Sequence, residues 1–296
     1  MAEPLPLALV QAPATPAGDT AAFTADVERL LRDRPANRLV VYPELHLCGL
    51  AADPATAPLS PAELAEPIDG PRDKELATLA GDLGIWLVPG SVYELGEEGK
   101  VYNTAPVYSP DGERVAAYRK IFPWRPYEVC TPGSEFVVID LAGYGRVGLS
   151  ICYDAWFPEH ARQLGWMGAD LVLNLVQTPT VDRQQETVLA RANAITNQVF
   201  VASLNGAAPT ALGRSMLVDP EGRVRAELPG AEHAVLTDVV DLGQAATVRR
   251  FGTAGLNRLW DQIQPGDPAL SLPAYSGRID HLSWGAGRGA ADSRKG

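Results

Sequence analysis

The chain has 296 residues, of which 46% are hydrophobic and 21% charged, a composition that allows a sizeable buried core. Its 25 Lys and Arg against 36 Asp and Glu give a formal net charge of -11, which disfavours general nucleic-acid binding because nucleic-acid backbones are anionic. No apolar run approaches the roughly 20 residues of a membrane span, and the first residues lack the pattern of a signal peptide. Three sparse cysteines, Cys48, Cys130 and Cys152, suit free thiols better than a disulfide framework, so we expect a soluble, cytoplasmic protein.

The first 120 residues alternate between strand and helix patterns. Phe23, Val27 and Leu30 recur at helical spacing between a possible cap at Asp19 and a stop at Pro35. A loop rich in Pro and Ala is expected from Cys48 to about Pro61. The other expected elements are strands over 5–11, 39–45, 85–95, 101–109 and 114–120, and a helix over 73–83.

The rest of the chain continues the mixture after a loop over 122–133. The expected strands cover 136–141, 146–152, 170–176, 199–204, 214–218, 224–228 and 234–240, and the expected helices cover 158–167, 182–198, 246–251 and 256–263. Strand–helix alternation interleaved with hairpins predicts layered sheets with helices outside. Residues 265–284 carry little secondary-structure signal and read as an extended arm, and 285–296 as a mobile tail.

Cys152 ends a strand of the buried type, and a helix is expected about six residues later. This places its thiol at a strand-to-helix turn, where backbone N–H groups can face an oxyanion. A cysteine attacks as the thiolate and needs a base or a cation nearby. His46 cannot be dismissed as that partner, but Glu44 and Lys120, each at the end of an expected strand, are better candidates.

Three motifs in order, Tyr42-Pro-Glu44, Tyr118-Arg-Lys120 and Cys152-Tyr-Asp154, resemble the Glu-Lys-Cys catalytic set of the nitrilase superfamily of carbon–nitrogen hydrolases. The resemblance extends over most of the chain and includes a turn region at Asn103, Pro132-Gly133, Asn174 and Arg191-Ala-Asn193. It implies an αββα sandwich that dimerises into an α-ββ-αα-ββ-α arrangement, with no metal and no organic cofactor. On this basis residues 1–264 form the carbon–nitrogen hydrolase domain, and 265–296 form the C-terminal arm and tail.

Carried over by position, the resemblance makes Cys152 the nucleophile, Glu44 the general base and Lys120 the oxyanion stabiliser. Glu128 occupies the place of a second glutamate that many members carry after the lysine, although it can equally be an exposed loop charge. The backbone N–H of Tyr153 is a second oxyanion donor. The expected reaction is hydrolysis of a non-peptide C–N bond through a Cys152 thioester, with release of ammonia or an amine.

The substrate class implied is a linear carboxamide or carbamoyl compound, because Cys-Tyr-Asp is more typical of amidase branches than of nitrilases. Ala155 and Trp156 stand where members that accept a free carboxylate often carry arginine, which disfavours such substrates. Trp124, Tyr127 and Trp156 are candidates for an apolar pocket wall, or for simple core packing. The alternatives are a nitrilase, an acyltransferase that uses the same thioester, and a binding protein that keeps the fold without catalysis. A homodimer or higher homo-oligomer is expected.

Overall fold

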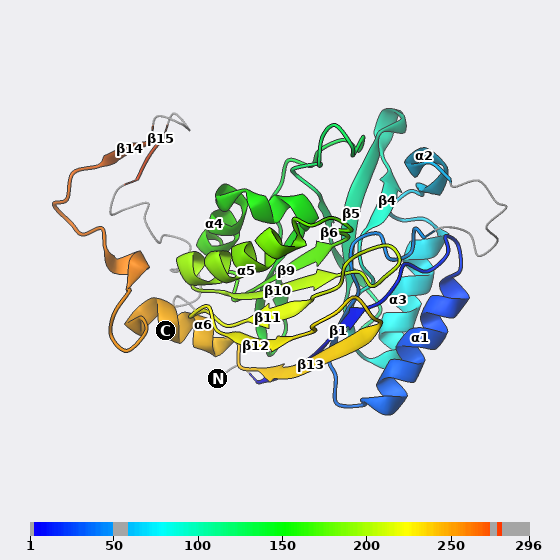
Figure 1. The fold of residues 1–296 in the computed structure, drawn as a ribbon, viewed down its shortest axis with the longest axis horizontal. Coiled ribbons are helices and arrows are strands. Elements are labelled where there is room, and N and C mark those ends of the chain that lie inside the picture. Colours follow the sequence, from blue (N-terminus) through cyan, green and yellow to red (C-terminus); the bar gives the residue numbers. More distant parts are fainter. Residues whose placement is uncertain (1–2, 50–58, 273–276, 280–296) are drawn as a thin grey trace.

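Two mixed β-sheets lie face to face, and helices cover the outer side of each sheet (Figure 1). The computed structural model describes residues 3–49, 59–272 and 277–279. The first sheet has the order β13(Ala234–Val240)-β1(Leu5–Gln11)-β2(Leu39–Val41)-β3(Trp86–Val88)-β5(Val101–Tyr108)-β4(Val92–Leu95), and β6(Arg114–Arg119) pairs with β5. The second sheet has the order β12(Val224–Glu227)-β11(Met216–Val218)-β10(Phe200–Asn205)-β9(Leu171–Val176)-β8(Gly145–Ile151)-β7(Val138–Leu141).

The helices form the two outer layers of this sandwich. The first sheet is covered by α1(Thr20–Asp33) and α3(Pro71–Leu83), and the second by α4(Pro158–Trp166) and α5(Arg183–Asn197). A single turn, α2(Pro61–Leu64), precedes α3, and α6(Gly243–Phe251) follows the last strand of the first sheet. Within the described ranges, no helix combines the length and apolar character needed to cross a bilayer.

The alternation of side chains along the strands explains why the sheets stack. In β1, Leu5, Leu7 and Leu9 point into one large core shared by both sheets, whereas Ala8 and Val10 face the core beneath α1 and α3. In β9, Leu171, Leu173 and Leu175 enter the shared core, and Val172 faces α4 and α5. Strands buried on both faces need a helix layer outside each sheet, so the predicted αββα sandwich is confirmed.

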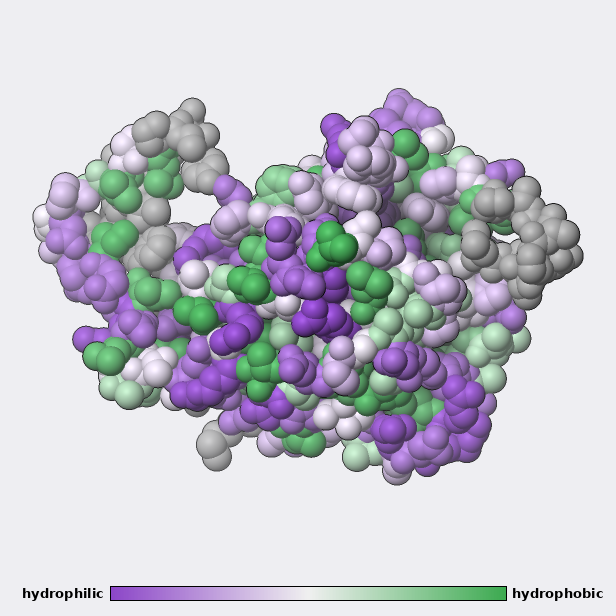
Figure 2. Space-filling view, in the orientation of Figure 1, coloured by the Kyte–Doolittle hydropathy of each residue, from purple (hydrophilic) through white to green (hydrophobic). Residues whose placement is uncertain are grey.

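Helix α1 forms where its apolar stripe predicts it. Asp19 caps its first turn by accepting a 2.9 Å hydrogen bond from the Ala22 N–H, and Phe23, Val27 and Leu30 are buried against the first sheet. Its outer face is hydrophilic, as the residues at the lower right of Figure 2 show.

Several predicted boundaries are wrong for identifiable reasons. The expected helix over 256–263 shrinks to a 3₁₀ turn, Leu259–Asp261, because Ala254 and Asn257 take positive φ angles of 50° and 57°. The short helix α2 begins where the loop was expected to end, and its signal is the Ser60–Glu63 capping box. The expected strand over 85–95 breaks into β3 and β4.

The break between β3 and β4 centres on Gly90, whose φ of 93° needs glycine. A Cβ atom at Gly90 would lie 2.0 Å from the carbonyl oxygen of Pro43, next to Glu44. We therefore expect Gly90→Ala to lower the free energy of unfolding and to reduce any activity that depends on Glu44.

Gly143→Ala is the matched control for this substitution. Gly143 has a similar φ of 88°, but a Cβ atom there meets nothing within 4 Å, so its cost is the backbone strain alone, about 1–2 kcal/mol. Because of overpacking, the free energy of unfolding of Gly90→Ala, measured by urea denaturation, should be about 1–3 kcal/mol lower than that of the control. Equal unfolding free energies for the two variants would contradict this close approach of Gly90 to Pro43.

The described part of the expected arm contains secondary structure. Two short antiparallel strands, β14(Leu270–Leu272) and β15(Gly277–Ile279), form a separate hairpin at the left of Figure 1. The expectation of little secondary structure in this stretch is therefore wrong for these residues. The expected mobile tail, 285–296, lies outside the described residues.

Candidate active site

The predicted triad residues follow the carboxyl ends of strands from both sheets. Glu44 lies three residues after β2, Lys120 directly after β6, and Cys152 directly after β8. Glu44 and Lys120 therefore come from the first sheet and Cys152 from the second. The geometry brings all three to one end of the sandwich, where Glu44 and Lys120 are 4% and 2% exposed.

Lys120 lies between two carboxylates. Its Nζ is 3.0 Å from Glu44 Oε1 and 2.6 Å from Glu128 Oε2. The Asn103 side-chain amide donates one hydrogen bond to each carboxylate, at 2.9 Å to Glu44 and 3.0 Å to Glu128. The backbone N–H of Trp124 donates a further 3.0 Å bond to Glu128. Glu128 is thus part of the buried cluster and not an exposed loop charge.

These contacts shift the protonation equilibria of the cluster. Burial raises the pKa of Glu44, and the Glu128 charge adds to this, whereas Lys120 opposes it. Burial acts to lower the pKa of Lys120, but Glu44, Cys152 and Glu128 outweigh it and hold the pKa well above its usual value. Lys120 therefore stays an ammonium group at neutral pH, as a stabiliser of negative charge must.

Glu128 can be tested through this electrostatic coupling. Because its charge raises the pKa of Glu44, we expect Glu128→Gln to move the acid limb of the kcat/KM–pH profile to lower pH. Loss of the Lys120 contact should also reduce kcat about 10- to 100-fold. Glu135→Gln, an exposed glutamate in the same loop, is the control and should leave both unchanged. An acid limb at the same pH in wild type and Glu128→Gln would exclude the coupling.

Cys152 opens a short 3₁₀ turn, Cys152–Trp156, in place of the last residue of the expected strand. Its φ of 48° is unfavourable for a non-glycine residue, and Leu45, next to Glu44, has a similar φ of 51°. Buried Asp154 secures the turn by accepting 2.9 Å bonds from the N–H groups of Ile151 and Phe122.

A further network holds the nucleophile turn from behind. Burial raises the pKa of Asp154 to about 6, and the Tyr118 hydroxyl donates a 2.7 Å bond to it. His160 lies 2.7 Å from the same hydroxyl, and burial lowers its pKa to about 3, so its ring is neutral. From the other side, the Asn193 amide on α5 donates a 3.0 Å bond to the Ala155 carbonyl. The turn is therefore tied to β6, α4 and α5.

The polar contacts that three further residues make at the site were not predicted from the sequence. The Gln177 N–H donates a 2.9 Å bond to Glu44 Oε2, and the Thr178 hydroxyl lies 3.7 Å from Cys152 Sγ. Asn103, which the resemblance names as part of a turn region, lies inside β5, within the expected strand over 101–109, and its side chain reaches both glutamates. Gln177 and Thr178 could have been found from their position directly after β9. Strands β8 and β9 are parallel neighbours, so their carboxyl ends meet at one edge of the sheet.

The predicted pocket residues lie beside the cluster in two groups. Trp124 and Tyr127 are exposed on the loop that carries Glu128, and their ring centroids are 4.5 Å apart. Trp156 is half-buried on the nucleophile turn, where its ring lies 6.0 Å from that of Tyr153. Arg125, between Trp124 and the residues that lead to Glu128, is also exposed.

The described residues contain no group of three or more His, Cys, Asp or Glu side chains placed to hold a metal ion. Of the other cysteines, Cys130 is buried and Cys48 half-buried, and burial raises the pKa of both thiols, to about 12 for Cys130.

Comparison with known proteins places this chain in a family. Residues 6–250 match the family model for carbon-nitrogen hydrolases. The omega-amidase NIT2 of Homo sapiens is 34% identical over 208 residues, which cover 64% of this chain and 73% of that protein. Nitrilase homolog 2 of Dictyostelium discoideum is 33% identical over 196 residues, which cover 59% of this chain and 58% of that protein.

Solved structures agree with this assignment. Nit3 of Saccharomyces cerevisiae, a member of branch 10 of the nitrilase superfamily, superposes with a TM-score of 0.72 at 29% identity, over 84% of this chain and 94% of that one. A cysteine-to-alanine variant of the amidase from Nesterenkonia sp. AN1, in complex with butyramide, superposes with a TM-score of 0.69 at 26% identity, over 84% of this chain and 95% of that one. The expected nitrilase-superfamily fold and enzyme class are confirmed, and the chain belongs to the carbon-nitrogen hydrolase family.

Proposed function

We propose that this protein hydrolyses a small linear amide through a thioester on Cys152, with Glu44 as general base and Lys120 as oxyanion stabiliser. The single observation that carries the proposal is the buried ammonium group of Lys120, held between Glu44 and Glu128 beside a cysteine at a strained turn. The relatives that are amidases support an amide as the substrate.

The first half of the reaction forms the acyl-enzyme. Glu44 accepts the thiol proton as Cys152 Sγ attacks the amide carbon, and the carbonyl oxygen becomes an oxyanion. Lys120 and the backbone N–H of Tyr153 stabilise that charge, an effect of about 3–4 kcal/mol per donor. Protonated Glu44 then returns the proton to the amide nitrogen, the C–N bond breaks, and ammonia or an amine leaves.

The second half consumes the thioester. Glu44, again ionised, takes a proton from a water molecule as the water oxygen attacks the acyl carbon. The C–S bond then breaks and protonated Glu44 returns its proton to Cys152 Sγ, which releases the carboxylic acid and restores the thiol. Because the reaction needs only proton transfers and two nucleophiles, the Cys152 thiol and water, it requires neither an organic cofactor nor a metal. The same thioester can pass its acyl group to an amine, which is the acyltransferase alternative.

The proposed substrate class is an uncharged carboxamide or carbamoyl compound, since Ala155 and Trp156 offer no cation to a substrate carboxylate. Trp124, Tyr127 and Trp156 are the proposed apolar contacts. Trp124 and Tyr127 are exposed and Trp156 is half-buried, so all three present surface to a ligand. Turnover should be compared for butyramide, butyronitrile and succinamate. We expect ammonia release to be fastest with butyramide. Turnover of the nitrile without turnover of the amide would establish the nitrilase alternative, and a preference for succinamate would exclude the uncharged class.

We further propose that the protein works as a homodimer or higher homo-oligomer. Val181, Val188 and Ile195 lie seven residues apart on and just before α5, and they are 86%, 66% and 48% exposed. An apolar stripe of this kind fits a second copy of the chain. Three free thiols with no disulfide support a reducing, cytoplasmic setting. The division into a catalytic domain, 1–264, and an arm, 265–296, remains part of this proposal.

A further inference from the structure

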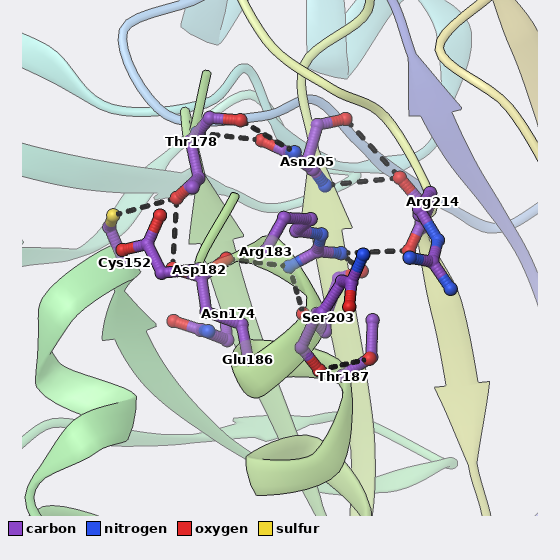
Figure 3. Close-up of polar contacts among 12 residues, drawn as sticks. Cys152, Asn174, Thr178, Asp182, Arg183, Glu186, Thr187, Ser203, Asn205 and Arg214 are labelled. Carbon is purple, nitrogen blue, oxygen red and sulfur yellow. Dashed lines mark hydrogen bonds and ion pairs between the residues drawn. The ribbon is translucent and has the colours of Figure 1, made fainter. Parts of the chain in front are cut away.

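A second buried polar cluster lies beside the nucleophile (Figure 3). It consists of Arg183 and Glu186 at the start of α5 and of Thr178 in the loop before it, and these side chains are 1%, 4% and 4% exposed. The reaction outlined above gives none of the three a role.

The Arg183 guanidinium is fixed by all five of its N–H donors. They reach the carbonyl oxygens of Gly213, Ser203 and Arg214, the Ser203 hydroxyl, and Glu186 Oε2, at 2.9–3.2 Å. Because no donor is left over, Arg183 cannot bind a substrate carboxylate. Arg183 instead fixes the position of Glu186, because it donates a 3.0 Å hydrogen bond to Glu186 Oε2.

The other oxygen of Glu186 fixes the direction of the Thr178 hydroxyl. Glu186 Oε1 lies 2.8 Å from Thr178 Oγ1, and a carboxylate paired with arginine only accepts hydrogen bonds. The hydroxyl proton of Thr178 therefore points to Glu186. The Thr178 backbone is also held, because Asn205 accepts a 2.9 Å bond from its N–H and donates a 3.2 Å bond to its carbonyl.

With its proton directed at Glu186, Thr178 Oγ1 has only lone pairs to offer other neighbours. Cys152 Sγ lies 3.7 Å from this oxygen. A lone pair can accept the thiol proton but cannot stabilise a thiolate. We infer that the hydrogen-bonded series Arg183–Glu186–Thr178 positions the Cys152 thiol and withholds a hydrogen bond from its thiolate, so that the thiol proton passes to Glu44 only when a substrate is attacked. The inference rests on the proposed role of Cys152, and it makes Thr178, Glu186 and Arg183 positioning residues.

Glu186→Gln tests the direction of the hydrogen bonds that run from Arg183 through Glu186 to Thr178. Arg183 offers only donors, so the new side chain must turn its carbonyl oxygen to Arg183 and its NH₂ to Thr178, which then directs its proton at Sγ. The thiolate of Cys152 gains a hydrogen bond and loses a nearby negative charge. We expect the rate of iodoacetamide alkylation at pH 8, followed by mass spectrometry of the peptide that contains Cys152, to rise about threefold or more.

A double-mutant cycle separates this route from a through-space charge effect. In a Thr178→Val background there is no hydroxyl to reverse, so Glu186→Gln should change the alkylation rate less than twofold. An unchanged or lower rate in the Glu186→Gln single variant would overturn the inference, and so would the same increase in both backgrounds. Retained turnover in Cys152→Ala would instead overturn the proposed function, so the two failures are distinguishable.

Turnover by Thr178 variants decides the matter if Glu186→Gln does not fold. Thr178→Val should lower kcat about tenfold with KM within twofold, because the thiol is no longer aligned, and Thr178→Ser should restore kcat to within about threefold. Thr180→Val, an exposed threonine in the same loop, is the control and should match wild type. Wild-type kcat in Thr178→Val would overturn the inference.

Discussion

Cys152→Ala is expected to abolish amide hydrolysis while the protein stays folded. The methyl group cannot form a thioester, so only binding and the oxyanion site remain, and the loss of kcat should be at least about 10⁴-fold. The side chain is small and its contact with the Thr178 hydroxyl is long, at 3.7 Å, so the melting temperature should change little. Ammonia release and thermal unfolding measure the two effects.

Cys130→Ala is the matched control, because it removes a second thiol, which is buried and lies outside the triad. It should keep wild-type kcat and KM, at the cost of a small cavity. Measurable turnover by Cys152→Ala, or an equal loss in Cys130→Ala, would contradict the role of Cys152.

Lys120→Ala is expected to reduce both activity and stability. Loss of the ammonium group removes one oxyanion donor, which should lower kcat about 10²- to 10³-fold. It also leaves Glu44 and Glu128 buried side by side without a cation, and breaking a buried pair in this way costs about 3–5 kcal/mol. Part of that cost disappears if Glu44 takes up a proton, so the destabilisation should be larger at pH 8 than at pH 5.

Lys100→Ala is the control that shows how much of the destabilisation in Lys120→Ala depends on burial of the ion pair. Lys100 also pairs with a glutamate, at 2.8 Å to Glu98, but the two side chains are 48% and 77% exposed. An ion pair of that kind is worth about 0.2–1 kcal/mol, so this variant should unfold almost as wild type and keep full activity. Urea denaturation at the two pH values gives the comparison. A pH-independent loss in Lys120→Ala would contradict the burial of two carboxylates around Lys120.

The fold was predictable where local pattern and burial agree. Local pattern alone predicts β1 and α1, without knowledge of the segments they pack against. In β1, Leu5, Leu7 and Leu9 alternate with Ala8 and Val10, and α1 carries an apolar stripe at helical spacing. The sequence did not predict the break at Gly90 or the loss of the helix over 256–263. The first depends on the distant carbonyl of Pro43, and the second on positive φ angles at residues that are not glycine.

The site was predictable from residue type but not from spacing. Glu44, Lys120 and Cys152 were joined only through their resemblance to a family, since no local rule connects Glu44 to Lys120, 76 positions away, or Lys120 to Cys152, 32 positions away. Gln177 and Thr178 were missed because their partners, Glu44 and Cys152, are 133 and 26 residues away. Pairing of β8 with β9 is what brings them to the nucleophile.

Mass spectrometry of acid-quenched enzyme during butyramide turnover tests the Cys152 thioester most directly. The proposed mechanism predicts a butyryl group on the peptide that contains Cys152, which is released by hydroxylamine as the hydroxamate and is absent from Cys152→Ala. Steady-state turnover with no acyl group on Cys152, or with the acyl group on another residue, would contradict it.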